Sequence, residues 1–293
     1  MLLSTFIFSH AQEKTINNIT KKPKIGLSLA GGGAKGFAHV GVLKVLDSLG
    51  IKVDYIAGTS MGAIVGSLYA SGYTANDIEK VILDTDFYGL IANEKKREET
   101  SLFNKNNDKY LLNIPIVNGK INVLPKAIST GQKNIYMLKE LLNNVSDVTD
   151  FSKLPIPFMC IGTNLETGKM EIFEKGDLIK SIMASSAYPG LLDPVKIGDS
   201  LYIDGAMTVN YPSKPLKDKG IDFVIGVDLS QPLATREELN SAVAILNQVI
   251  DYANVKETEN QYKYTDINIK PDLKGFSATS YGDKVTILNR GLD

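Results

Sequence analysis

The pattern of apolar and polar positions along the chain predicts alternating strands and helices. Compact apolar runs bounded by glycine, proline or polar residues are typical of buried strands, whereas apolar positions three or four residues apart are typical of helices. Strands are predicted at 24–30, 52–57, 157–164, 200–204, 220–230 and 265–270. Helices are predicted after the first strand up to Gly50, and then at 62–72, 75–84, 131–144, 177–184 and 236–262. Strands that alternate with helices through short connections pair in parallel, so the sequence predicts an α/β fold with a mainly parallel central sheet.

Turn and cap residues mark the ends of several of these elements. Gly50 and Gly72 are expected to end helices, because glycine readily adopts the left-handed conformation that follows a helix. Thr74 is the expected N-cap of the helix at 75–84. The run LETGKM predicts a hairpin after the strand at 157–164.

The segment 86–149 departs from this alternation. It contains the polar run NEKKREET and then IPIVNGKINVLP, in which Asn118-Gly119 is a strong signal for a two-residue hairpin turn. The helix at 131–144 follows. We interpret the segment as an insertion that covers one rim of the sheet, and we expect its apolar residues to face a cleft there as a lid.

The first residues resemble a processed targeting segment. The run MLLSTFIFSHAQ has an apolar stretch, followed by small residues at the −3 and −1 positions of a signal-peptidase site. Residues 1–22 are therefore interpreted as a remnant of a secretion signal plus a polar linker, and residues 23–293 as the folded domain. The protein is expected to be exported, to the periplasm, outer membrane or surface of a bacterium. Because DKVTILNRG begins another helix close to the last residue, we expect the domain to be cut from a longer protein.

Composition and charge exclude some function classes. The chain has 293 residues, of which 43% are hydrophobic, and its net charge of -1 argues against a nucleic-acid-binding domain. The single cysteine, Cys160, lies in the apolar run PIPFMCIG and is expected to be a core thiol. No cluster of residues has the spacing of metal ligands, and no cofactor is expected.

Three consecutive glycines and a lysine follow the first predicted strand. The run GGGAKG at 31–36 satisfies the G-x-G-x-x-G pattern of dinucleotide-binding loops, in which backbone N–H groups approach a phosphate. That pattern also needs an acidic residue at the carboxyl end of the next strand, but Asp54 lies near its start. Lys35 is followed by Gly36 rather than Ser or Thr, which does not match a Walker loop. The alternative is that these N–H groups face the oxyanion of a reacting ester.

The second predicted strand runs into GTSMG at 58–62, a G-x-S-x-G motif. Between a strand and a helix this motif forms a nucleophile elbow, a tight turn that holds its serine in a strained conformation. Gly58 and Gly62 remove side chains that would clash in such a turn. Ser60 would lie at the N-terminus of the next helix, where the dipole favours developing negative charge. The other interpretation is a glycine-rich turn with a capping serine.

A serine nucleophile needs a base, and the chain has only 2 histidines. His10 lies in the N-terminal run, and His39 shares helical spacing with apolar residues, which predicts a packed ring with satisfied hydrogen bonds. A carboxylate is therefore the expected base. Asp204 ends a predicted strand and, if the strands are parallel, shares a rim with the ends of the first two. Asp228, at the end of FVIGVD, is the rival candidate.

The motifs GGGAKG, GTSMG and DGA, in this order and each after an apolar strand, resemble the patatin-like phospholipase family. The runs ASSAYPGLLDPV and DGAMTVNYP also fit, and the resemblance extends from about 24 to 228. It implies a three-layer α/β/α fold and a Ser-Asp dyad that acts on acyl esters of lipids. By position, Ser60 is the nucleophile and Asp204 the base. The oxyanion hole would consist of backbone N–H groups of the glycine loop, namely Gly31, Gly32 and Gly33.

Two positions of the motifs vary within this family. Ala206 is an accepted form of the DGA motif. An arginine often fills the position of Lys35, so the role of this lysine is open. It could stabilise the glycine loop, attract a lipid phosphate, or be a solvated surface charge.

The leading hypothesis is a lipid acyl hydrolase of the phospholipase A, lysophospholipase or esterase type, with an acyl-serine intermediate. An acyltransferase that uses the same dyad is one alternative, and a non-catalytic lipid-binding domain of an outer-membrane protein is another. The expected partners are a phospholipid or other acyl ester and a membrane surface, with no nucleic acid. The resemblance extends to bacterial patatin-like domains fused to an outer-membrane barrel, so a C-terminal barrel in the full-length protein is expected, and a homodimer is considered.

Overall fold

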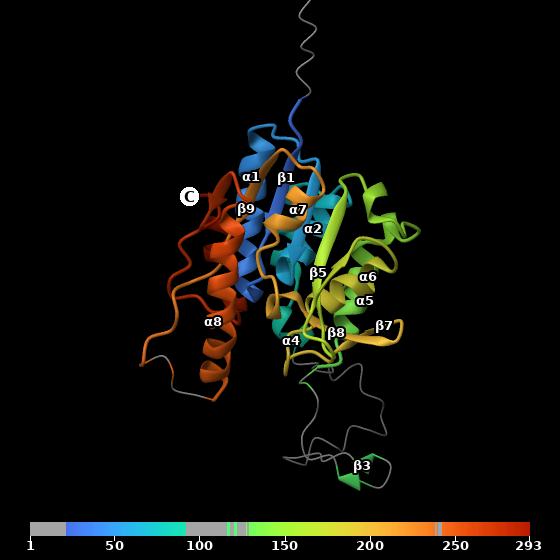
Figure 1. Ribbon diagram of the computed structural model, residues 1–293, viewed down its shortest axis with the longest axis vertical. Coiled ribbons are helices and arrows are strands. Elements are labelled where there is room, and N and C mark those ends of the chain that lie inside the picture. The colour runs from blue at the N-terminus through green and yellow to red at the C-terminus, as the bar shows by residue number, and fades with distance from the viewer. Residues whose placement is uncertain are drawn as a thin grey trace, which may run out of the picture.

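A central sheet of eight strands organises the described part of the chain (Figure 1). The computed structural model describes residues 22–91, 116–117, 120–121, 127, 129–237, 239 and 242–293. The order of the strands is β10–β9–β1–β2–β5–β8–β7, and β6 also pairs with β5. The strands are β1 (Ile25–Leu29), β2 (Tyr55–Thr59), β5 (Phe158–Asn164), β6 (Met170–Phe173), β7 (Val195–Ile197), β8 (Ser200–Asp204), β9 (Phe223–Val227) and β10 (Ile267–Ile269).

The sheet is mostly parallel, as the sequence predicts. β10, β9, β1, β2 and β5 are parallel neighbours, so their carboxyl ends lie along one rim. β6, β7 and β8 add antiparallel pairs at the β5 side, and β5 and β6 form the hairpin predicted from LETGKM. The rim formed by the parallel strands is the place where open α/β sheets bind their ligands.

Helices cover both faces of the sheet and make the three layers. α2 (Met61–Ala70) and α6 (Leu178–Ser185) contact one face, and α7 (Ser213–Asp218) packs against β1, β2 and β9 on the other. In β2, Ala57 belongs to the buried cluster that includes Leu216 of α7, whereas the neighbouring Ile56 lies against α2. Strands that are buried on both faces read as continuous apolar runs. This explains why the strands were visible in the sequence as compact hydrophobic segments.

The remaining helices extend these layers. α1 (Ala38–Ser48) contacts α2, α3 (Ala75–Asp84) and α9 (Lys284–Asn289). α8 (Ala242–Tyr262) contacts α7 and lies beside β9 in Figure 1. Thr74 caps α3 in a reciprocal arrangement with Asp77, which confirms the predicted start of that helix. No helix in the described residues combines the length and apolar character needed to span a membrane.

Only parts of the predicted insertion at 86–149 belong to the described residues. These parts include α4 (Phe87–Ile91), the antiparallel pair β3 (Ile116–Val117) and β4 (Lys120–Ile121), and α5 (Gln132–Leu141), which packs on α6. The β3–β4 pair is the hairpin expected on either side of Asn118-Gly119. The rest of the predicted lid and residues 1–21, with the expected signal remnant, lie outside the described residues. The lid and the secretion signal stay predictions.

Candidate active site

Ser60 lies in a strained turn between β2 and α2. Its φ is 55° and its ψ is −122°, and among the described residues no other non-glycine residue has a positive φ. A side chain in this region costs on the order of 1–3 kcal/mol and persists only where the surrounding structure enforces it. The strain predicted from the G-x-S-x-G motif is therefore present at the serine.

Two glycines allow this turn because they remove a Cβ from close backbone contacts. A Cβ on Gly58 would lie 2.4 Å from the carbonyl oxygen of Gly62, which is inside the elbow itself. A Cβ on Gly62 would lie 2.2 Å from the carbonyl oxygen of Leu29 at the end of β1. Any side chain at either position would push α2 away from the sheet and displace Ser60.

Asp204 reaches the elbow because β2 and β8 meet end to end along one edge of β5. β6 occupies the other edge of β5 over the same positions. β2 ends with Thr59 opposite Ile161. At the next position of β5, Gly162 pairs with Asp204, the last residue of β8. β8 is antiparallel to β5, so the expectation that its strand is parallel was wrong. β8 therefore runs towards the carboxyl end of β2 from the opposite side, and its last residue, Asp204, lies next to that end.

Ser60 and Asp204 are joined by a short hydrogen bond. Ser60 Oγ donates to Asp204 Oδ2 at 2.7 Å, and the backbone N–H of Ala206 donates to Oδ1 at 2.9 Å. Burial raises the pKa of Asp204 to about 6, and the hydrogen bonds from Ser60 and Ala206 oppose the shift. A buried carboxyl that titrates just below neutral pH can be ionised at pH 7 and still accept a proton readily.

Two serines at the end of α6 fix the backbone of the elbow. The N–H of Ser60 donates to Ser185 Oγ at 3.0 Å, and Ser186 Oγ donates to the carbonyl oxygen of Ser60 at 3.3 Å. Both belong to the run ASSAYPG, which the sequence analysis used only as part of the family resemblance. Their positions at the end of a predicted helix gave no indication of this contact.

The glycine loop lies directly against the serine, and Asn210 holds its first residue. A Cβ on Gly31 would lie 2.9 Å from Ser60 Cβ. The N–H of Gly31 donates to Asn210 Oδ1 at 3.1 Å and to the Asn210 carbonyl oxygen at 3.2 Å, while Asn210 Nδ2 donates back to Gly31 O at 3.2 Å. Among the described residues, the N–H groups of Gly32 and Gly33 have no partner. Asn210 therefore accepts the N–H of Gly31, whereas no described residue accepts the N–H of Gly32 or Gly33.

Asp228 is held by a network of its own. Its buried carboxylate accepts the N–H and hydroxyl of Ser230, both at 2.8 Å, and the Tyr262 phenol at 2.6 Å. Lys270 Nζ forms an ion pair with it at 3.0 Å. These partners all lie on β9, α8 and β10 or their connections, so the structure brings Asp204, and not the rival Asp228, to Ser60.

Lys35 is half-buried beside the glycine loop, which does not fit a fully solvated surface charge. Burial lowers the pKa of Lys35, and the negative charges of Asp251 and Asp228 oppose this shift. Within the described residues Lys35 makes no ion pair. The two other interpretations, a role in the loop and attraction of a phosphate, are compatible with this position.

His39 is packed inside the protein and takes no part in the Ser60 hydrogen bonds. Its ring is fully buried, Nε2 lies 2.7 Å from the carbonyl oxygen of Ala30, and burial lowers the pKa of His39 to about 4. Nδ1 has no partner among the described residues, so the expectation that both ring nitrogens are hydrogen-bonded is not met there. Cys160 is a buried free thiol, as expected. In the part of the chain that the structure describes, no group of three or more His, Cys, Asp or Glu side chains could hold a metal ion.

Residues 27–217 match the profile of the patatin-like phospholipase family, and this range includes the glycine loop, the elbow and Asp204. The chain belongs to the patatin-like phospholipase family. The fold agrees with this, because VipD from Legionella pneumophila superimposes with a TM-score of 0.51, covering 93% of this chain and 66% of that one. With 15% sequence identity, that likeness concerns the fold alone.

Two proteins with similar sequences both carry the name NTE. Lysophospholipase NTE1 of Debaryomyces hansenii is 32% identical over 211 residues, which is 72% of this chain but 12% of the fungal protein. An uncharacterised NTE family protein of Mycobacterium tuberculosis is 27% identical over 245 residues, which is 79% of this chain and 59% of that protein. The chain therefore spans only part of both relatives. The family and the lysophospholipase relatives support a lipid hydrolase as the broad activity.

Proposed function

We propose that this chain hydrolyses acyl esters of lipids, as a phospholipase A, lysophospholipase or esterase, with Ser60 as nucleophile and Asp204 as general base. The observation that carries the proposal is the 2.7 Å hydrogen bond from Ser60 Oγ to Asp204 at the tip of a strained elbow. A capping serine in an ordinary turn would need neither the strain nor a buried carboxylate partner. A binding module would not need them either.

In the first half of the reaction, Ser60 Oγ attacks the acyl carbonyl carbon while Asp204 takes the hydroxyl proton. The tetrahedral intermediate carries its negative charge on the former carbonyl oxygen. Asp204 then returns the proton to the leaving alcohol as the ester bond breaks, which leaves an acyl group on Ser60. A pKa of about 6 suits Asp204 for both steps, since it is ionised at neutral pH and not too weak a base.

In the second half, water replaces the alcohol. Asp204 takes a proton from the attacking water and returns it to Ser60 Oγ when the acyl bond to the serine breaks. The products are a fatty acid and the free serine. An alcohol that entered in place of water would give acyl transfer with the same residues.

The oxyanion that forms twice in this cycle is assigned to the N–H groups of Gly32 and Gly33. The assignment is supported by the lack of a partner for either N–H among the described residues, and by the contact between the glycine loop and Ser60. In other acyl-transfer sites each such donor contributes roughly 10²–10³ in rate. α2 begins just after Ser60, so its dipole adds to the stabilisation.

The setting of this activity is part of the proposal. The substrate is proposed to come from a membrane surface and the protein to be exported, the latter on the sequence of residues 1–22 alone.

The proposal is tested by measuring fatty acid released from lysophospholipid micelles by titration at constant pH. Ser60→Ala and Asp204→Asn should each lose at least about 10³-fold in kcat, and the double variant should lose little more, because the two side chains act as one unit. His39→Gln is the control and should keep a substantial part of the activity. Full hydrolysis by folded Ser60→Ala would sink the proposal and leave the lipid-binding alternative.

A further inference from the structure

The last two residues of the glycine loop contact segments that come late in the chain. A Cβ on Gly32 would lie 3.1 Å from Leu229 Cδ1, and a Cβ on Gly33 would lie 2.3 Å from the carbonyl oxygen of Ala278. Both neighbours lie outside residues 27–217, the range that matches the family profile. The loop that carries the proposed oxyanion donors is therefore in contact with a part of the chain that the family match does not include.

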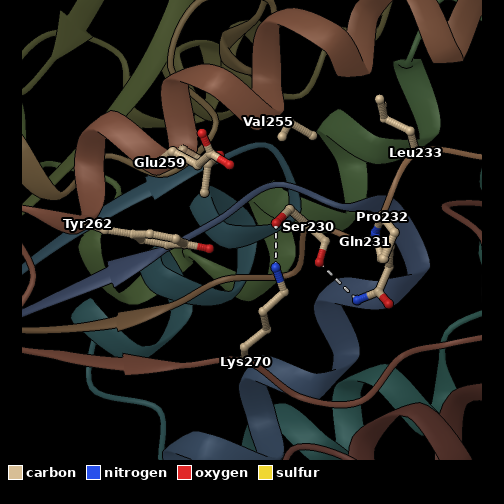
Figure 2. Close-up of a pocket in the computed structure, with 9 residues that line it drawn as sticks. Ser230, Gln231, Pro232, Leu233, Val255, Glu259, Tyr262 and Lys270 are labelled. Carbon is tan, nitrogen blue, oxygen red and sulfur yellow. Dashed lines mark hydrogen bonds between the residues drawn. The ribbon is translucent and has the colours of Figure 1, made fainter.

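Leu229 gives Gly32 a fixed surface to pack on. Leu229 is fully buried, and its neighbours in the chain, Asp228 and Ser230, are both held by Lys270 Nζ, each at 3.0 Å. Ser230 and Lys270 line the pocket drawn in Figure 2, which shows the hydrogen bond between them. The contact with Gly32 is made by side-chain carbon atoms, so it limits the space of the loop but does not orient its N–H groups.

Ala278 does orient the loop, because it forms a hydrogen bond with it. The N–H of Ala34 donates to the Ala278 carbonyl oxygen at 2.8 Å. Gly33 has a φ of 55°, in the left-handed region that favours glycine, so the chain turns sharply just before this bond. A run of glycines has access to many conformations, and contacts from outside the run must select one of them. The bond to Ala278 fixes the peptide group that directly follows Gly33.

A turn at 277–280 presents the Ala278 carbonyl to the glycine loop. The N–H of Ser280 donates to the carbonyl oxygen of Ser277 at 3.2 Å, which closes the turn. Two hydroxyls reinforce it, because the N–H of Ser277 donates to Ser280 Oγ at 3.0 Å and the N–H of Thr279 donates to Ser277 Oγ at 3.3 Å. Ser277 is exposed, so its hydroxyl contributes to the turn and not to the core.

The residue after the turn anchors it beside the glycine loop. Tyr281 is 7% exposed, its ring stacks on Phe87 at 5.6 Å, and it meets Phe37 edge-on at 6.1 Å. Phe37 is the last residue of the short helix η1 (Gly33–Phe37), which begins in the glycine loop. Burial raises the pKa of Tyr281 to about 12, and the negative charge of Asp204 adds to this rise, which agrees with a position near the dyad.

We propose that the turn at 277–280 is a positioning element for the oxyanion hole. Its Ala278 carbonyl keeps the glycine loop in the conformation in which the N–H groups of Gly32 and Gly33 meet the oxyanion. This inference rests on the lipid hydrolysis proposed for Ser60, since that reaction forms the oxyanion. Donors arranged for the transition state lower its energy without strengthening substrate binding, so the turn acts on kcat and not on KM.

The first experiment removes the two hydroxyls of the turn and measures steady-state hydrolysis of a short-chain nitrophenyl ester. In Ser277→Ala/Ser280→Ala, kcat should fall at least about fivefold with KM unchanged, because a misplaced donor loses part of the roughly 10²–10³ in rate that it contributes. The melting temperature should change little, since neither side chain belongs to the core. Ser277→Thr keeps its hydroxyl and should retain kcat. An unchanged kcat in the double variant would overturn the proposal.

Ser152→Ala is the matched control. Ser152 Oγ donates to Asp150 Oδ1 at 2.7 Å in another exposed turn. The adjacent Phe151 packs on Phe158, the first residue of β5, so this turn lies at the opposite end of the parallel strands from the elbow. The control should leave kcat and KM unchanged. An equal fall of kcat in the control would show that the effect is not specific to the turn at 277–280, and would overturn the proposal.

The second experiment tests the oxyanion hole itself with a trifluoromethyl ketone inhibitor. Ser60 Oγ adds to its carbonyl carbon, and the resulting hemiketal oxygen takes the place of the oxyanion. The inhibition constant should rise in Ser277→Ala/Ser280→Ala by the factor by which kcat falls, because both depend on the same donors. A fall in kcat with an unchanged inhibition constant would mean that the turn acts elsewhere, and would overturn its assignment to the oxyanion hole.

The third experiment separates a failure of this proposal from a failure of the proposed function. Hydrogen–deuterium exchange of the peptide that spans 31–37 is measured in the Ser60→Ala chain, with and without the two changes in the turn. The changes should speed exchange there, because the Ala34 N–H loses a fixed acceptor. Unchanged exchange would overturn the turn as the support of the loop, even in an active lipid hydrolase. Faster exchange in a protein whose unaltered chain hydrolyses no ester would refute the proposed function and confirm that the turn orders the loop.

Discussion

Replacement of Asp204 by asparagine should make the folded protein more stable at neutral pH while it removes activity. Burial raises the pKa of Asp204 from 3.8 to about 6 in the folded protein. Between these two pH values the folded protein holds a proton that the unfolded chain has released. Stability therefore falls as the pH rises from 3.8 to about 6, and above that the ionised carboxylate stays buried at a constant cost.

The size of this effect follows from the two pKa values. A difference of about two units corresponds to about 3 kcal/mol of unfolding free energy. Asparagine is neutral at every pH and has nearly the same shape, so the variant avoids this cost. The asparagine oxygen can still accept the N–H of Ala206. The asparagine nitrogen is a donor, so in the hydrogen bond with Ser60 the hydroxyl must become the acceptor. This change reduces the gain in unfolding free energy by about 1 kcal/mol. We expect Asp204→Asn to be about 1–3 kcal/mol more stable at pH 7.5.

The assay is urea unfolding of both proteins between pH 4 and 8, with kcat/KM measured on the same samples. Every other titrating group, including His39, is present in both proteins, so the difference between them isolates Asp204. The difference should be small at pH 4, grow through pH 6 and level off above pH 7. A difference that does not change with pH, or one in which the variant becomes less stable than the parent as the pH rises, would refute the reasoning.

Three further results are expected from the same geometry. The kcat/KM of the unaltered chain should rise through a pH of about 6 to a plateau, because Asp204 must be ionised, and a profile that is flat from pH 5 to 8 would exclude it as the base. His39→Gln should lose about 1–2 kcal/mol in urea unfolding at pH 7.5. Burial lowers the pKa of His39, so the unaltered chain loses stability as the pH falls from 6.5 towards 4. His39→Gln lacks this group, and its stability should fall less over the same pH range. An equal fall in both proteins would contradict this expectation. Gly62→Ala should either fail to fold or fold without activity, since its Cβ would lie 2.2 Å from a backbone oxygen, and an active, equally stable variant would show that the elbow is not as described.

The elbow could be predicted from the sequence because its requirements are local. The turn needs glycines two positions before and two positions after the serine. The run GTSMG meets this requirement around Ser60, and it lies between an apolar strand and a helix of small residues. The helix ends at Gly50 and Gly72, which have φ values of 65° and 100°, are local in the same way. The cap of α3 at Thr74 needs only the residues that follow it.

The rest of the site depends on contacts between distant segments, which local patterns do not contain. Ser60 and Asp204 are 144 positions apart, and their side chains meet although the strand that carries Asp204 runs opposite to the expected direction. The head-to-head meeting of β2 and β8 follows from the pairing of β5 with both, and no property of SLYID alone predicts it. Gly31 and Asn210 are 179 positions apart, so the sequence could not show that Asn210 accepts the N–H of Gly31.

The most direct test of the central claim, that Ser60 is a nucleophile activated by Asp204, is covalent labelling with a fluorophosphonate probe followed by peptide mass mapping. We predict a single adduct on Ser60 in the unaltered chain at pH 7.5, none in Ser60→Ala, and labelling slowed by at least about 10²-fold in folded Asp204→Asn. An adduct on another residue, or equal labelling rates in the unaltered chain and Asp204→Asn, would contradict the account.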